Sequence, residues 1–175
     1  MPRRTARSLA SAIKSHAAQL NSTAAAASLQ TLAALKHPGD GDVLDTLCAT
    51  VSASITTLPP KTLVHVLSAA SALGHRDPRL VDGIVGALLW HVPVLPTACL
   101  ADVVCSLATL QHKDAMTDVL LDAVAEAGIK RMSRFGPNEL SRMVLGFAKL
   151  EHWGPMDARL QENMLRTMLS RHQVC

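Results

Sequence analysis

The apolar residues of this chain recur with the period of an α-helix in four separate stretches. In one of them Leu100, Val104, Leu107 and Leu110 follow one another at steps of four, three and three residues. Such spacing places the side chains on one face of a helix. Similar stretches lead up to three other leucines: Ala25, Leu29 and Leu32 to Leu35; Leu63, Leu67 and Ala70 to Leu73; Leu140, Val144 and Phe147 to Leu150. The pattern predicts a helix ending near each leucine.

A small residue stands two positions before each of these leucines, where it would let neighbouring helices approach closely. The four are Ala33, Ser71, Ala108 and Ala148. We expect the helices to meet at these positions. Ser22 or Thr23 would cap the start of the first helix.

A histidine follows each leucine by two positions, so His37, His75, His112 and His152 are 38, 37 and 40 residues apart. After each histidine a break carries helix-start residues, such as Asp77-Pro78 and Asp114. Second apolar stripes then follow, through Val43, Leu47 and Val51; Leu80, Ile84 and Leu88; Val119, Leu120 and Val124; and Leu160, Met164 and Met168. Helix-turn-helix units at this period are typical of stacked repeats. The sequence predicts an all-α fold, an α-solenoid of about four helix-turn-helix repeats of 37–40 residues.

The first 21 residues form a segment of their own. Leu9, Ile13, Ala17 and Leu20 make one more helical face, which would cover the open end of the stack. We therefore expect residues 1–21 to be a basic N-terminal segment and capping helix, and residues 22–175 to be the four-repeat solenoid. The chain is long enough for one continuous core. It has no apolar run of about 18 residues, so we expect no membrane span.

Charge is distributed unevenly along the chain, although the net charge is only +3. Residues 1–39 carry +5, residues 40–128 carry −6 and residues 129–175 carry +4. The basic ends are where an anionic partner would be met. The acid-free, Arg-rich and Ala/Ser-rich N-terminus also has the composition of an organelle-targeting segment. We expect a mitochondrial matrix location, with a plastid or the cytoplasm, where the segment is simply a basic first helix, as the alternatives.

The stretch from Phe135 to His152, Phe-Gly-Pro-Asn-Glu-Leu-Ser-Arg-Met-Val-Leu-Gly-Phe-Ala-Lys-Leu-Glu-His, resembles a repeat of the octotricopeptide and heptatricopeptide class of organellar α-solenoids. A related proline-to-histidine pattern recurs from Pro60 to His75 and from Pro96 to His112. The resemblance covers residues 22 to about 170. It implies RNA binding or membership of an organellar ribonucleoprotein, often the mitochondrial ribosome. Four repeats would read only about four bases, which favours a part fixed inside a larger assembly.

Basic residues in both end regions are the candidate RNA-phosphate contacts. Lys130, Arg131 and Arg134 lie together between the third and fourth hairpins, and basic clusters of this kind bind phosphate without reading sequence. The alternative is a solvated loop after Gly128. The full candidate set is Arg3, Arg4, Arg7, Lys14, Lys130, Arg131, Arg134, Arg142 and Lys149.

The repeated histidines are expected to close the first helix of each hairpin, with the imidazole near its last carbonyls. Equivalent residues of successive hairpins are a whole repeat apart, so we expect no metal site, and no other cofactor is indicated. No phosphate-binding loop, GxSxG or HExxH motif occurs, which argues against an enzyme and against a small-molecule substrate. Cys99 and Cys105 are expected in or near the core of one helix.

Two functions are left by these observations. One is a non-catalytic, RNA-associated structural subunit of a mitochondrial ribosome, which holds rRNA phosphate with its basic ends and neighbouring proteins with its acidic middle. The other is a protein-only scaffold or accessory subunit of another organellar complex, such as a respiratory complex. The apolar residues Val92, Val94 and Leu95, expected to be exposed, would suit either function.

Overall fold

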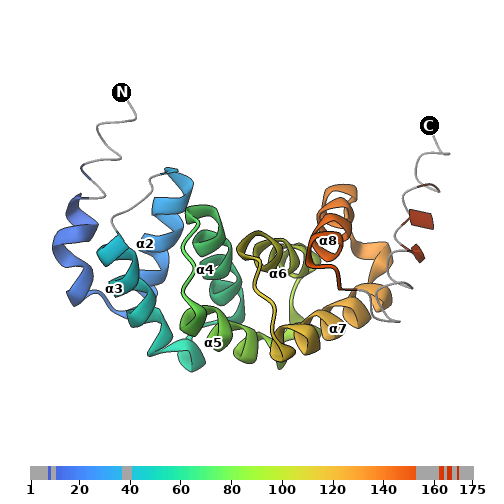
Figure 1. The fold of residues 1–175 in the computed structure, drawn as a ribbon, viewed down its shortest axis with the longest axis horizontal. Coiled ribbons are helices and arrows are strands. Elements are labelled where there is room, and N and C mark those ends of the chain that lie inside the picture. Colours follow the sequence, from blue (N-terminus) through green and yellow to red (C-terminus); the bar gives the residue numbers. More distant parts are fainter. Residues whose placement is uncertain are drawn as a thin grey trace. The chain divides into compact units, whose positions relative to one another are not determined.

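The computed structural model describes residues 8, 11–36, 41–152, 162, 163, 165, 166 and 169. All regular elements in these ranges are helical (Figure 1). The all-α class predicted from the apolar periodicity is therefore confirmed for this part of the chain. Contacts within the chain group it into two compact units, unit 1 (Met1–Ala87) and unit 2 (Leu88–Cys175).

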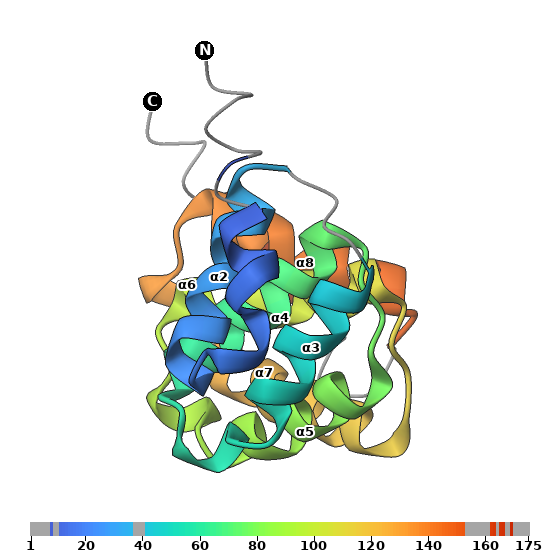
Figure 2. The ribbon, with the colours of Figure 1, turned by 90° about the vertical axis from the view of Figure 1, so that its left-hand side faces the viewer.

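Unit 1 begins, among its described residues, with a helical segment over 11–16 that continues into η1 (Ala17–Gln19). It then contains α2 (Ser22–Ala34), α3 (Gly41–Ser52), η2 (Ile55–Thr57), α4 (Pro60–Leu73) and most of α5 (Pro78–Leu89). Helix α2 packs against both α3 and α4 (Figure 2), and η1 contacts α3. Ile13 and Ala17 are buried, as the apolar face expected for the capping helix requires.

Unit 2 takes up the chain at the last two residues of α5. It contains η3 (Val92–Val94), α6 (Thr97–Leu110), α7 (Ala115–Lys130), η4 (Met132–Arg134) and α8 (Pro137–Leu150). Helices α6 and α8 lie side by side (Figure 1), and α7 contacts both α6 and η3. In each unit the first helices of successive predicted hairpins thus pack on each other, α2 on α4 and α6 on α8. The second helix of the fourth predicted hairpin, opened by Pro155, lies outside the described residues.

The predicted helix ends agree closely with the structure. Helices α4, α6 and α8 end at Leu73, Leu110 and Leu150, and Leu35 follows directly after α2. The next residue, or the second next after α2, has positive φ: Lys36 (50°), Gly74 (67°), Gln111 (54°) and Glu151 (51°). This left-handed residue ends the helix, because it directs the following N–H groups back to free carbonyls.

Helix starts follow the predicted chemistry at three positions and differ at one. Asp114 Oδ1 accepts from Thr117 N at 2.7 Å, and Asp77 Oδ1 accepts from Arg79 N at 3.0 Å. Pro60 and Pro137 occupy first helical positions. The expected caps of α2, Ser22 and Thr23, are wrong: Asn21 Oδ1 accepts from Ala24 N at 2.8 Å, so the cap stands one residue earlier.

The predicted apolar stripes form the core with two corrections. Residues such as Leu29, Leu67, Leu107 and Phe147 are fully buried. Val119, however, is 51% exposed, because α7 turns Thr117, Leu120, Leu121 and Val124 inward instead. Cys99 is buried and Cys105 half-buried on α6, as expected.

The site of closest helix approach also differs from the expectation. Ala148 is exposed, whereas Gly146 is buried between α8 and α6. A Cβ at Gly146 would lie 2.6 Å from Val104 Cγ1 and 3.2 Å from the Val104 carbonyl carbon. The small residue that the packing needs stands four positions before the final leucine, where Ala69 and Ser106 are also buried. No described helix is long and apolar enough to cross a membrane.

Candidate functional site

Arg131, predicted to bind phosphate, is instead a tether inside unit 2. Its guanidinium donates to the carbonyl oxygens of Leu95 and Val92, the latter at 3.1 Å, and its Nε donates to Ala127 O at 3.2 Å. Burial, and then the neighbouring Arg134, lower its pKa. The side chain therefore fixes the end of α7 to η3. Sequence spacing could not show this contact, because its acceptors lie more than 30 residues earlier.

Two further candidates have carboxylate partners. Lys130 Nζ lies 2.6 Å from Glu126 Oε1, one helical turn away, with 70% of its side chain exposed. Arg142 on α8 pairs with Asp102 on α6, and Asp102 raises its pKa. These pairs lower the positive charge that the two side chains would offer to phosphate.

The remaining candidates fall into two groups. Arg134 and Lys149 are exposed and make no ion pair with any described residue. They stand before the start of α8 and near its end, so the helix separates them. Lys14 is exposed in unit 1. Arg3, Arg4 and Arg7 lie outside the described residues. The structure therefore does not gather the candidate cations into one patch within unit 2.

An apolar surface of unit 2 stands out more clearly than its basic residues. A cavity of about 270 Å³ lies between η3 and α7, lined by Leu89, Val92, Pro93, Ala123, Glu126, Ala127, Lys130 and Arg131. Next to its lining residues in sequence, Trp90 is 83% exposed and Val94 is 74% exposed. We call the cavity, Trp90 and Val94 the η3–α7 surface. The expected exposure of Val92 and Leu95 is wrong, because both are buried at the base of η3.

Large apolar residues continue along the exposed face of α7. Met116 is 49% exposed and Val119 is 51% exposed. Together with Ala123 and Ala127 they follow one another at helical spacing, so they share one side of α7. Single exposed apolar residues are common, but several on one side of a helix are typical of a protein interface.

The repeated histidines close their helices through the backbone rather than the ring. The amide N of His75, His112 and His152 donates to the carbonyl of a residue five positions earlier, at 3.0, 3.2 and 3.4 Å. The expected approach of the imidazole to the last carbonyls is wrong, since the rings lie beside carboxylates. His112 Nε2 is 2.8 Å from Asp114 Oδ2. The two ring nitrogens of His152 are each 3.2 Å from a carboxylate of α7, Asp118 and Asp122.

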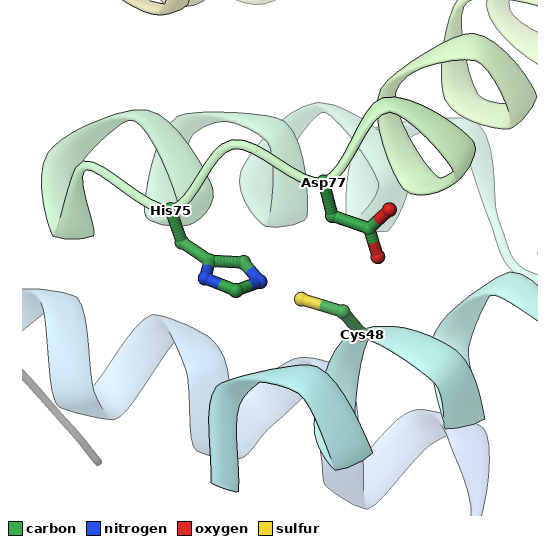
Figure 3. A group of neighbouring side chains, drawn as sticks. All are labelled: Cys48, His75 and Asp77. Carbon is green, nitrogen blue, oxygen red and sulfur yellow. The ribbon is translucent and has the colours of Figure 1, made fainter. Parts of the chain in front are cut away.

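In unit 1 the corresponding histidine belongs to a cluster with metal-ligand character. Ligand atoms of Cys48 on α3 and of His75 and Asp77 in the α4–α5 connection all lie within 4.8 Å of one another (Figure 3). His75 Nε2 is 3.4 Å from Asp45 Oδ1 but has no hydrogen-bond partner, although the atom is buried. Burial, then Asp77 and Asp45, raise the pKa of the Cys48 thiol to about 12.

The sequence contains a signal for this cluster that periodicity alone did not reveal. Counting whole repeats of 37 residues, Cys48 corresponds to Val85 and to Asp122. Asp122 is the residue that contacts Nε2 of the next histidine, His152. The same register therefore predicts contact between Cys48 and His75.

Similarity to known proteins adds nothing to this geometry. No family model matches the chain, and no curated protein has a significantly similar sequence. The function must therefore be argued from the surfaces and clusters of the two units.

Proposed function

We propose that this chain is a non-catalytic helical-repeat subunit of a larger assembly, held there by protein contact through the η3–α7 surface. The observation that carries the proposal is the exposure of Trp90, at 83%, beside an apolar cavity. Tryptophan is the residue type most enriched among side chains that dominate binding energy at interfaces. The Glu126–Lys130 ion pair at the cavity adds a polar edge, as interfaces commonly have.

RNA binding is the second candidate function, and a specific observation favours it. Arg134 and Lys149 are exposed and lack ion pairs with described residues, so both are available to phosphate. The resemblance to organellar repeat proteins and the +5 charge of residues 1–39 support the same function. In this form of the proposal the assembly is a ribonucleoprotein of the mitochondrial matrix, such as the mitochondrial ribosome, in which rRNA and neighbouring proteins both contact the chain.

Recovery of partners from cells separates the two functions. We expect partners that co-purify with the wild-type chain to survive ribonuclease treatment and to be lost with Trp90→Ser combined with Val94→Ser. Lys61→Ala, an exposed change on α4, is the matched control that retains them. Loss on ribonuclease treatment, together with loss in Arg134→Ala/Lys149→Ala, would instead establish RNA as the main partner.

The salt dependence of binding to rRNA fragments tests the RNA contact directly. If Arg134 and Lys149 each neutralise a phosphate, removing both lowers the slope of log affinity against log salt by about two. Wild-type affinity that is absent at low salt would end the RNA proposal and leave the protein contact.

A further inference from the structure

The cluster around His75 brings together donors from two separate segments of unit 1. Cys48 reaches it from α3, while His75 and Asp77 reach it from the α4–α5 connection, and the thiol sulfur lies between the ring and the carboxylate (Figure 3). A tetrahedral zinc ion places its ligand atoms about 3.3–3.8 Å apart, given bonds of about 2.0–2.3 Å. The observed spacing, within 4.8 Å, is reached from that by small side-chain rotations.

The chemistry of the cluster is incomplete without a further partner. Cys48 is fully buried, and the buried His75 Nε2 has no hydrogen bond among the described residues. A buried polar atom without a partner destabilises a fold, so native structures supply one. Asp77 Oδ1 accepts from the N–H groups of Arg79 and Leu80, which leaves its Oδ2 for another contact.

Comparison of the repeats isolates what is special here. At the position of Cys48 the third hairpin has Asp122, which lies 3.2 Å from His152 Nε2 and satisfies it directly. A thiol at this position does not satisfy His75, but as a thiolate it is a much better zinc ligand than an aliphatic side chain such as Val85. The donor set of sulfur, imidazole nitrogen and carboxylate oxygen suits Zn²⁺.

A fourth donor and a path to solvent are present. Asp45 Oδ1 lies 3.4 Å from His75 Nε2, and the Asp45 side chain is 71% exposed. A cavity of about 500 Å³ leads to it, lined by Asp45, Ala49, Ser52, Arg76, Asp77, Pro78 and Arg79. One thiolate and two carboxylates around a dication leave a net charge of −1, which the two arginines offset.

We propose that Cys48, His75, Asp77 and Asp45 bind a single Zn²⁺ ion that joins α3 to the α4–α5 connection. On binding, the ion replaces the thiol proton of Cys48, which is released to solvent, and it accepts an electron pair from each of the four ligand atoms. With four protein ligands the site is closed, so its role is structural rather than catalytic.

Cobalt is the probe for this site, because Co²⁺ takes zinc sites and reports a thiolate ligand by absorption. We expect the full-length reduced chain to bind one Co²⁺ with a sulfur-to-cobalt charge-transfer band and visible bands of tetrahedral intensity, both removed by added Zn²⁺. The band should be absent in Cys48→Ser and retained in Cys105→Ser, the matched control at a half-buried cysteine of unit 2. A wild-type chain without the band, or a Cys48→Ser chain with it, overturns the proposal.

A second variant keeps the test decisive if Cys48→Ser fails to fold. Asp45 is exposed, so Asp45→Asn should leave the fold intact and weaken Co²⁺ binding by about tenfold or more. Unchanged affinity in this variant contradicts the proposed ligand set. Zn²⁺ should also raise the thermal unfolding midpoint of wild type and of Cys105→Ser, since it binds only the folded chain, and an unaltered midpoint counts against the site.

Discussion

At the scale of single residues, charged side chains in this protein bind its own backbone as often as they face solvent. Arg131 shows this best, because its guanidinium serves three carbonyl groups from two segments. The sequence predicted a basic cluster at residues 130–134, and the residues are there. Their roles differ because one of them is used by the fold.

Replacing Arg131 tests its role as a tether. Arg131→Ala should lower the free energy of unfolding by about 1.5–3 kcal/mol, the usual range for hydrogen bonds to a charged group. Arg131→Lys should recover only part of the loss, since an ammonium cannot span the same acceptors. Arg134→Ala, at an exposed side chain, should change it by less than about 0.5 kcal/mol. Denaturant unfolding measures all three; equal effects at 131 and 134 would contradict the assignment.

Asp114 links a helix cap to pH. Its pKa lies below the ordinary value of 3.8, first because Thr117 N–H donates to it, with His112 also contributing. A lowered folded pKa means that the carboxylate stabilises the fold above pH 3.8 and that this contribution is lost as the pH falls further. Asp114→Ala should remove about 1 kcal/mol of stability at neutral pH.

The matched control is Asp114→Asn, which keeps an acceptor for Thr117 N–H. Unfolding curves at neutral and acidic pH should show a smaller loss for Asn than for Ala. They should also show a smaller gap between wild type and Ala in acid. A gap that widens in acid would reverse the expected sign.

At the scale of elements, helix ends and core stripes were predictable, while the contacts between helices were not. The four leucines that end the first helices follow from periodicity and terminal chemistry, which are local. Gly146 could not be found this way, because its importance depends on Val104 on another helix. Val119 was misplaced because the apolar residues on the two sides of α7 are similar in number, so the pattern does not fix its rotation.

Two glycines separate close packing from helix propensity. Gly146→Ala should destabilise the fold by about 1–3 kcal/mol, because the added methyl group meets Val104 Cγ1 and backbone. Gly86→Ala, within α5, meets nothing within 4 Å and should stabilise by up to about 1 kcal/mol, since alanine is the better helix former. Thermal unfolding of both variants decides this; a stabilised Gly146→Ala would show that α6 and α8 pack more loosely than described.

At the scale of the whole molecule, the all-helical class follows from the sequence, whereas the solenoid and its repeat number stay predictions. Within each unit the first helices of neighbouring hairpins do pack together, as a repeat array requires. The candidate sites were less predictable than the fold. The cluster of Cys48, His75 and Asp77 depends on a sidewise register between hairpins, and the η3–α7 surface depends on which apolar residues the core leaves out.

The boundary between the two units falls inside α5, between Ala87 and Leu88. Proteases need an extended stretch of backbone, which a hydrogen-bonded helix does not offer. Limited trypsin digestion should therefore spare this boundary and cut first at Lys113, exposed in the short connection from α6 to α7. The molecule would come apart within a compact unit before it came apart between units, so any piece meant to fold alone should be cut at hairpin connections.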